Sequence, residues 1–200
     1  MRMRNPKYKD EVINSCAFLI KDEINFEKDQ PLHIEIGMGK GNFILNMALN
    51  HPDINFIGIE KYSSVASVAI KKMMDYNLPN LKIIISDIVN LEELLKNKVD
   101  VIYLNFSDPW PKARHEKRRL TSPNFLRLYD KFFKDKCILI QKTDNDDLFS
   151  YSVSMVEDYG YKIDEISYDL HNTDIENVKT EYEEKFSNMG IKIKYLKASK

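Results

Sequence analysis

With 200 residues, 43% of them hydrophobic, and no linker rich in Pro, Gly or Ser, the sequence predicts a single domain over 1–200 with a sizeable core. Its net charge is only −1, so any polyanion must be attracted by local clusters of charge and not by the protein as a whole. No run reaches about 18 apolar residues and the N-terminus lacks a signal-peptide core, which predicts a cytoplasmic protein without membrane segments.

The predicted elements alternate between helix and strand along most of the chain. After a short basic arm, Met1–Pro6, which is expected to be mobile, the apolar spacing of Tyr8–Lys21 predicts a helix. Strands are predicted at 32–36, 54–59, 81–85, 99–106, 136–141, 161–168 and 191–196. Helices are predicted between them at 42–49, 65–76, 91–96 and 146–159, and one more begins at Pro123 with Ser122 as its cap.

This alternation is typical of an α/β fold with a parallel sheet and helices on both faces. The last two predicted strands, 161–168 and 191–196, lack a long helix between them, which indicates an antiparallel strand at one edge of the sheet. In sheets of this kind ligands bind at the carboxyl ends of the strands. Residues that directly follow a strand are therefore the candidates for a functional site.

A glycine-rich loop joins the first predicted strand to its helix. The three glycines of Glu35-Ile-Gly-Met-Gly-Lys-Gly41 allow a sharp turn and a close approach of the backbone to a ligand. Acids end the next two strands: Glu60, where a carboxylate reaches ribose hydroxyls, and Asp87, near the expected adenine. Each of these two acids alone is more typical of a helix cap or an exposed turn. Three acids at successive strand ends, Glu35 included, beside a glycine loop favour an adenosine site.

The glycine spacing, G-x-G-x-G, differs from the G-x-G-x-x-G that sets a helix N-terminus against a pyrophosphate. Glu35 also lies within an apolar strand, where an uncompensated carboxylate is costly. A positively charged ligand, such as the amino group and sulfonium of S-adenosylmethionine, offsets that cost better than the phosphates of a dinucleotide. The alternative for Glu35 is a salt bridge to Lys40 or to another nearby base.

The most informative segment is Asp108-Pro-Trp-Pro-Lys-Ala-Arg-His-Glu-Lys-Arg-Arg119, which follows a predicted strand. Pro109 and Pro111 forbid a helix and are expected to keep Asp108 and Trp110 extended. A carboxylate, an aromatic ring and a run of basic residues are the groups needed to hold a nucleobase and neutralise phosphates. The alternative is a solvated basic loop with a packed tryptophan, and Trp110 either stacks on a base or braces the loop.

Further polar residues follow the later strands. Asp144 either caps the helix that begins near Asp146 or contacts a substrate. The charged run Thr180–Phe186 is an exposed turn, a short helix or part of a binding site. His115 lies among basic residues, which favours a phosphate contact over metal binding, and no other group has zinc spacing. The two cysteines are far apart, which predicts reduced thiols in an intracellular protein.

Together these motifs resemble the bacterial tRNA (guanine-N7)-methyltransferases. The resemblance rests on the Glu35–Gly41 loop, Glu60, Asp87, the Asp108–Arg119 segment and Thr180-x-Tyr-Glu-x-Lys-Phe186, and it covers nearly the whole chain. It implies a Rossmann-like class I methyltransferase with a mostly parallel seven-stranded sheet, helices on both faces and an antiparallel edge strand. It also implies S-adenosylmethionine-dependent methylation of guanine N7 at position 46, in the variable loop of tRNA.

The resemblance further implies roles for the residues that match the family's motifs, with Asp108 as the catalytic residue. The implied cofactor contacts are Glu35, Gly37, Gly39, Gly41, Glu60, Asp87 and Asp108. The implied substrate contacts are Lys112, Asp144, Thr180, Glu181, Tyr182 and Glu183. The implied RNA contacts are Arg114, His115, Glu116, Lys117, Arg118 and Arg119. The expected partner is tRNA, without a metal or a membrane, and the expected state is a monomer or a homodimer.

Three other functions stay open from the sequence. A methyltransferase for a small molecule or a protein is disfavoured by the basic cluster, and a dehydrogenase that uses NAD would share the glycine loop. A non-catalytic RNA-binding protein is disfavoured by Asp108 and Asp144. If the substrate is guanine in RNA, its N7 carries a lone pair and no proton, so catalysis is expected to depend on alignment and electrostatics.

Overall fold

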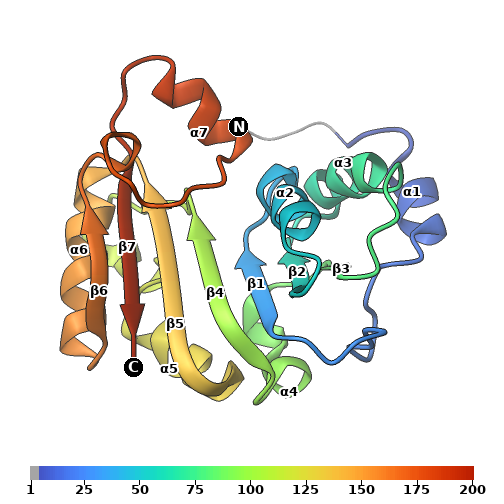
Figure 1. Cartoon of the computed structure of the whole chain (residues 1–200), viewed down its shortest axis with the longest axis horizontal. Coiled ribbons are helices and arrows are strands. Elements are labelled where there is room, and N and C mark those ends of the chain that lie inside the picture. The colour runs from blue at the N-terminus through green and yellow to red at the C-terminus, as the bar shows by residue number, and fades with distance from the viewer. Residues whose placement is uncertain (1–4) are drawn as a thin grey trace. The chain divides into compact units, whose positions relative to one another are not determined.

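The computed structural model describes residues 5–200, so most of the predicted arm lies outside the described residues (Figure 1). The chain divides into two compact units, one that ends at Leu94 and one from Leu95 to Lys200. Within residues 5–200, seven strands form a sheet in the order β3-β2-β1-β4-β5-β7-β6, which confirms the predicted α/β class. The prediction of a single domain stays a prediction. None of the helices in residues 5–200 is long and apolar enough to cross a membrane.

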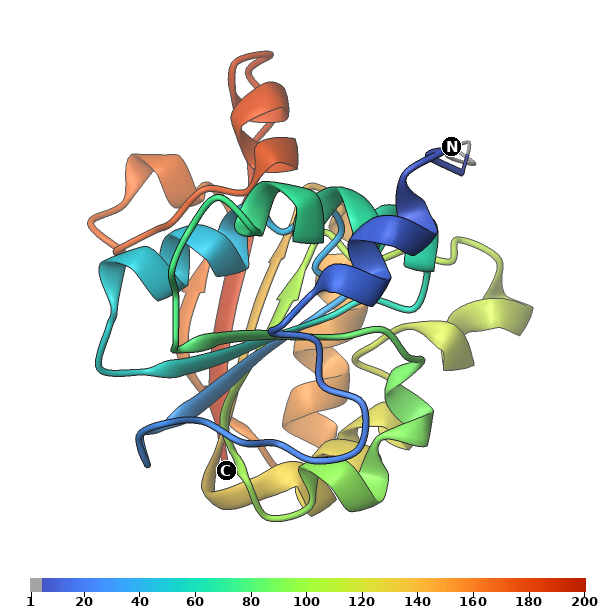
Figure 2. The same cartoon turned by 90° about the vertical axis from the view of Figure 1, so that its right-hand side faces the viewer.

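The first unit contains three parallel strands and the helices that connect them. The strands are β1 (Leu32–Ile36), β2 (Asn55–Ile59) and β3 (Leu81–Ile84). The helices are α1 (Lys9–Ser15), α2 (Asn42–Asn50), α3 (Ser63–Met73) and the 3-10 helix η1 (Ile88–Asn90). α2 packs against β2 and β3, and α1 lies along α3 (Figure 2). The predicted strands of this unit and the helices at 42–49 and 65–76 are confirmed, with ends that coincide or shift by up to three residues.

The helix predicted over Tyr8–Lys21 is wrong in its second half. α1 ends at Ser15, and the following segment runs extended beside β3. The Ile83 N–H donates to the Phe18 carbonyl (3.0 Å), and the Ile20 N–H donates to the Ile83 carbonyl (2.8 Å). An outermost strand leaves backbone groups unpaired on one side, and this segment satisfies them. The apolar residues after Ser15 therefore belong to an extended segment that pairs with β3, and not to the face of a helix.

The second unit contains the remaining four strands. They are β4 (Val99–Asn105), β5 (Phe133–Thr143), β6 (Lys162–Ser167) and β7 (Lys194–Ser199). Its helices are α5 (Pro123–Phe132), α6 (Asp146–Asp158), α7 (Glu181–Ser187) and the 3-10 helices η2 (Ala113–Arg118) and η3 (Leu170–Asn172), and α4 (Glu92–Leu95) spans the boundary. β4 and β5 are parallel, whereas β7 runs antiparallel to both β5 and β6. The predicted antiparallel strand is confirmed. It is β7, which lies between β5 and the outermost strand β6.

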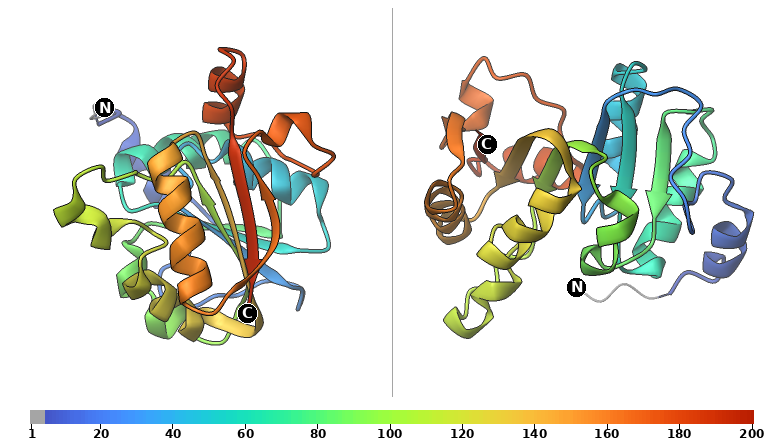
Figure 3. Two further views of the ribbon diagram at one scale, coloured as in Figure 1. Left: turned by 90° about the vertical axis from the view of Figure 1, so that its left-hand side faces the viewer. Right: turned by 90° about the horizontal axis from the view of Figure 1, so that it is seen from below.

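The long connection between β6 and β7 is anchored on the second unit. α6 packs against β5, β6 and β7 (Figure 3, left). A separate apolar cluster joins Leu170, Ile193 and Tyr195 to Phe106, Ile140 and Ile175. This cluster ties the connection to the strands, and α7 lies at the end toward which β4 points (Figure 1). The Thr180–Phe186 motif thus begins a short helix at the carboxyl end of β4.

Candidate functional site

In the first unit the glycine loop is tied to the end of β2. The Gly37 N–H donates to the Ile59 carbonyl (2.8 Å). Glu60 accepts two backbone hydrogen bonds, from Gly39 to Oε2 (3.2 Å) and from Tyr62 to Oε1 (2.9 Å). Burial raises the pKa of the Glu60 carboxyl, and these backbone N–H groups oppose that rise. Glu60 therefore fixes the path of the loop, a role that its sequence position alone does not reveal.

The other two predicted acids of this unit are Glu35, which lies on β1, and Asp87, which follows β3. Glu35 is 2% exposed within β1. Asp87 caps η1, where its Oδ1 accepts from the Val89 N–H (3.4 Å), and its Oδ2 lies 3.8 Å from the Lys61 ammonium nitrogen. The carboxyl ends of β1, β2 and β3 are adjacent because these strands pair in parallel. The first unit thus gathers the loop and the predicted acids at one edge.

Gly41 starts α2 with a left-handed backbone, φ 74°. A Cβ at this position would lie 2.5 Å from Met73 Cε and 3.0 Å from Ala69 Cβ. Gly41→Ala adds this crowding to a backbone cost of roughly 1–2 kcal/mol, so we expect a lower midpoint of thermal unfolding. Gly190→Ala is the matched control, because Gly190 has φ 76° but a Cβ there would meet open space. Equal losses in the two variants would show that the approach of the loop to α3 has no energetic weight.

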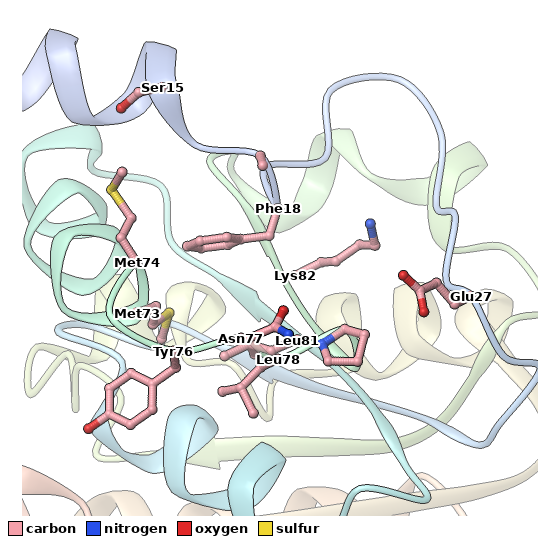
Figure 4. Close-up of a pocket in the computed structure, with 12 residues that line it drawn as sticks. Ser15, Phe18, Glu27, Met73, Met74, Tyr76, Asn77, Leu78, Leu81 and Lys82 are labelled. Atoms are coloured by element: carbon pink, nitrogen blue, oxygen red, sulfur yellow. The ribbon is translucent and has the colours of Figure 1, made fainter.

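A cavity of about 420 Å³ opens elsewhere in the first unit (Figure 4). Its walls are polar and apolar in similar measure and include Phe18, Met73 and Leu78, with Lys82 and Glu27 to one side. The residues that line it include neither the glycine loop nor any of the three predicted acids of this unit. This cavity is therefore distinct from the edge at which those residues gather.

In the second unit Asp108 lies on an exposed loop after β4. The backbone is left-handed on both sides of it, with φ 51° at Phe106 and φ 43° at Trp110. The extended conformation predicted for Trp110 is therefore wrong. The guanidinium of Arg118 lies 4.9 Å from the centroid of the Trp110 ring, and the His115 ring meets it edge-on at 5.8 Å. These contacts hold the ring against the loop and favour the bracing role for Trp110.

The predicted RNA-contacting residues do not share one environment. The exposed members of the set are Arg114, Glu116, Lys117 and Arg118, and His115 is half-buried. Lys112, which was predicted as a substrate contact, is exposed just before them. Arg119 is only 8% exposed and is directed into the protein. The predicted RNA contacts stay predictions, and the burial of Arg119 distinguishes it from its neighbours.

Asp144 and Tyr182 lie together at the ends of β5 and α7. The Tyr182 hydroxyl donates to Asp144 Oδ2 (3.1 Å), and the Lys194 ammonium donates to the Asp144 carbonyl (2.9 Å). The Tyr182 ring stacks on Phe186 with centroids 4.1 Å apart and lies 4.9 Å from Phe106. Because Phe106 precedes Asp108 by two residues, the structure brings Asp144 and Tyr182 beside the Asp108 loop.

The proposed cap role of Asp144 is wrong, because the N-cap of α6 is the next residue. Asn145 Oδ1 accepts the Leu148 N–H (2.8 Å). Its own N–H donates to Thr143 Oγ1 (3.1 Å), which turns the chain at the end of β5. The Asp144 carboxylate does not cap α6 and instead accepts the hydrogen bond from Tyr182.

Glu183 is fully buried and holds the α7 segment in place. Its Oε2 lies 2.7 Å from the Lys142 ammonium nitrogen, and its Oε1 lies 2.7 Å from His171 Nε2 and accepts from Asn177 (2.5 Å). Burial alone raises the pKa of the Glu183 carboxyl, but the charge of Lys142 and these hydrogen bonds bring the pKa below its ordinary value. Thr180 completes a capping box with Glu183 at the start of α7.

Thr180 and Glu183 therefore face inward, whereas Glu181 and Tyr182 are exposed. Sequence reasoning missed Lys142. Its place two residues after the apolar run Cys137-Ile-Leu-Ile, directly after a predicted strand, was a usable signal, since a buried lysine requires an acidic partner. Within residues 5–200, no cluster of three or more His, Cys, Asp or Glu side chains is arranged to hold a metal ion.

Comparison with protein families gives one match that spans most of the chain. The sequence model of a family described as "Putative methyltransferase" matches residues 29–196. Proteins named tRNA (guanine-N(7)-)-methyltransferase from three bacteria are each 44% identical to this chain. The protein of Limosilactobacillus reuteri (strain DSM 20016) aligns over 95% of both chains. Those of Macrococcus caseolyticus and Mycoplasmopsis agalactiae align over 99–100% of this chain and 99% of their own.

Solved structures with the same fold are more distant in sequence. An antibiotic-related methyltransferase superposes with a TM-score of 0.66 at 20% identity and covers 96% of this chain and 93% of its own. The 16S rRNA methyltransferase KamB gives a TM-score of 0.61 at 12% identity over 85% of this chain and 87% of its own. At these identities the likeness concerns the fold alone, and it confirms the Rossmann-like methyltransferase architecture.

Proposed function

Since this chain belongs to the tRNA (guanine-N7)-methyltransferase family, we propose that it transfers the methyl group of S-adenosylmethionine to N7 of guanine 46 in tRNA. The observation that carries the proposal is 44% identity to proteins of that name over 95–100% of this chain. Membership in an enzyme family argues against the dehydrogenase and the non-catalytic alternatives. The partner proposed with this function is tRNA, the proposed compartment is the cytoplasm, and the state is a monomer or a homodimer.

We assign S-adenosylmethionine to the first unit, and two observations support the fit. A Cβ at Gly37 or Gly39 would meet no atom within 4 Å, so the backbone of the loop is open to a ligand. Glu60 keeps lone pairs for ribose hydroxyls beyond its two backbone bonds, and Asp87 offers a carboxylate to the adenine amino group. We assign Glu35 to the positive charge of the methionine part. The bound cofactor supplies an electrophilic methyl group.

We assign the target guanine to the exposed groups of the second unit. The carboxylate of Asp144 is suited to accept hydrogen bonds from the N–H donors of guanine, and that of Asp108 to stabilise positive charge on its ring. The bond from Tyr182 to Asp144 (3.1 Å) orients that carboxylate. Glu183 and Thr180 support the group from inside by capping α7. The exposed cations Lys112, Arg114, Lys117 and Arg118 are suited to phosphates.

The chemistry requires alignment more than proton transfer. Guanine N7 attacks with its in-plane lone pair, so these residues need to orient the base and exclude water. Positive charge grows on the purine as the methyl group arrives, and the Asp108 carboxylate stabilises it. In folded tRNA this N7 takes part in a tertiary contact, so the base must leave its place at a cost of a few kcal/mol. Phosphate contacts by the basic residues offset that cost.

A transcript assay tests the function directly. The protein is incubated with methyl-labelled S-adenosylmethionine and an unmodified tRNA transcript that carries guanine at position 46. We expect label in the RNA and strand cleavage at position 46 under conditions selective for 7-methylguanine. The matched substrate carries adenine at position 46 and is expected to accept no label. Labelling of both transcripts, or cleavage at another guanine, would contradict the assigned position, and no labelling of either would contradict the function.

A further inference from the structure

Arg119 behaves unlike the other basic residues of its segment. Its Nε donates to the Pro109 carbonyl (2.9 Å), and one of its terminal nitrogens donates to the Trp110 carbonyl (3.4 Å). The guanidinium lies 4.4 Å from the centroid of the Tyr151 ring on α6. Only 8% of the surface of Arg119 is exposed, and two of its donors are bound to the loop.

The loop to which Arg119 donates these hydrogen bonds is the one that carries Asp108. Left-handed backbone at Phe106 and at Trp110 costs roughly 1–2 kcal/mol for each non-glycine residue and needs compensating contacts. Two successive carbonyls that bind one guanidinium fix the orientation of the peptide units that follow Asp108. The Tyr151 ring contacts the same guanidinium, so Arg119 links the loop to α6.

The fork of a guanidinium is well suited to this task. Its planar donors reach two acceptors in a fixed geometry, whereas the ammonium of a lysine is a single point of charge on a flexible stem. Bonds from a charged donor are also stronger than those between neutral groups. Replacement by lysine would therefore keep the charge and lose the geometry, which separates the two possible roles of Arg119.

We propose that Arg119 is a positioning residue that clamps the Asp108–Trp110 loop so that the Asp108 carboxylate is set for methyl transfer, and that it makes no contact with RNA phosphates. The inference rests on the proposed function. It assigns to Arg119 a task different from that of Arg114 and Arg118, which are exposed on the same segment.

The kinetic test uses Arg119→Ala and Arg119→Lys. Because small displacements of catalytic groups cost about 10²-fold in rate, we expect Arg119→Ala to lose about that factor in kcat, with tRNA affinity and its salt dependence unchanged. Arg119→Lys is expected to lose kcat as well, and millimolar guanidinium to restore part of the activity of Arg119→Ala beyond an equal amount of NaCl. Arg127→Ala, an exposed arginine on α5, is the control that keeps wild-type kcat.

A second readout needs no substrate. Trp110 is the only tryptophan in the chain, so its fluorescence reports on this loop alone. Arg119→Ala is expected to shift the emission to longer wavelength and to increase quenching by acrylamide, at temperatures well below unfolding. Arg114→Ala removes an exposed charge from η2 and is expected to leave the Trp110 emission unchanged, while it lowers the slope of log affinity against log salt.

Wild-type kcat in Arg119→Lys, together with a reduced salt slope and unchanged Trp110 quenching in Arg119→Ala, would identify a phosphate contact and overturn the proposal. If Arg119→Ala fails to fold, the lysine variant decides, since it keeps the charge that a phosphate contact requires. Failure of the proposed function is distinguishable, because wild-type protein would then label no tRNA while the fluorescence still tests the clamp.

Discussion

Asp108→Ala is expected to lose about 10²–10³-fold in kcat while its affinity for tRNA stays within about twofold of wild type. The side chain is exposed, and among residues 5–200 it makes no hydrogen bond or ion pair, so its removal costs no internal bond. The carboxylate is instead assigned to the charge that grows on the purine, which is absent from the ground state. Single-turnover rates and filter binding of tRNA separate the two effects.

Two further variants sharpen this test. Asp108→Asn keeps the shape and removes the charge, so it is expected to lose nearly as much kcat as Asp108→Ala. Asp158→Ala removes an exposed carboxylate at the end of α6 and is expected to keep wild-type kcat. A loss of tRNA affinity in Asp108→Ala as large as its loss of rate would assign the carboxylate to binding, against the proposed role.

Glu183→Gln is expected to lower the free energy of unfolding by about 3–5 kcal/mol, because one member of a buried ion pair is lost. The change removes the negative charge that lies 2.7 Å from the Lys142 ammonium nitrogen, and both groups are buried. For a chain of this length each kcal/mol lowers the melting temperature by roughly 2–4 °C. Glu184→Gln, on the exposed face of the same helix, is the control and is expected to melt like wild type.

The loss in Glu183→Gln is also expected to depend on pH. Burial raises the pKa of the Glu183 carboxyl, but the charge of Lys142 and the hydrogen bonds lower it more. The pKa in the folded protein therefore lies below its ordinary value of 4.5. A carboxyl with a lowered pKa stabilises the fold fully above the unfolded pKa and loses that contribution as the pH falls through the folded one. The stability difference between wild type and Glu183→Gln should therefore shrink as the pH falls below about 4.5. A difference that grows on acidification would contradict the assigned charge.

The strands and the glycine loop were predictable because their signals are local. An apolar run between turn residues, and glycines between a strand and a helix, depend on nearby residues alone. The helix over Tyr8–Lys21 failed for the opposite reason. Its second half meets Ile83, more than 60 residues away, and the unpaired backbone of that strand outweighs a helical spacing.

The site was predictable in the type of its residues and not in their tasks. Arg119 and Arg118 are adjacent and identical in type, yet one binds backbone carbonyls inside the protein and the other lies on a tryptophan ring. Glu183 likewise matched a substrate motif, while its partners Lys142 and His171 come from β5 and η3. Such pairings depend on which strands and loops become neighbours, which the sequence motifs do not encode.

The extended segment beside β3 has a consequence for the whole chain. Phe18 and Ile20 occupy the hydrogen-bonding groups of Ile83 on the outermost strand, although none of the motif residues lies in this part of the sequence. A protein shortened past Ile20 would keep every residue assigned to chemistry and yet offer a bare β edge to other molecules. Exposed edges of this kind recruit strands from neighbouring chains, so the cost of such a truncation would appear as aggregation and poor yield before any defect in methylation.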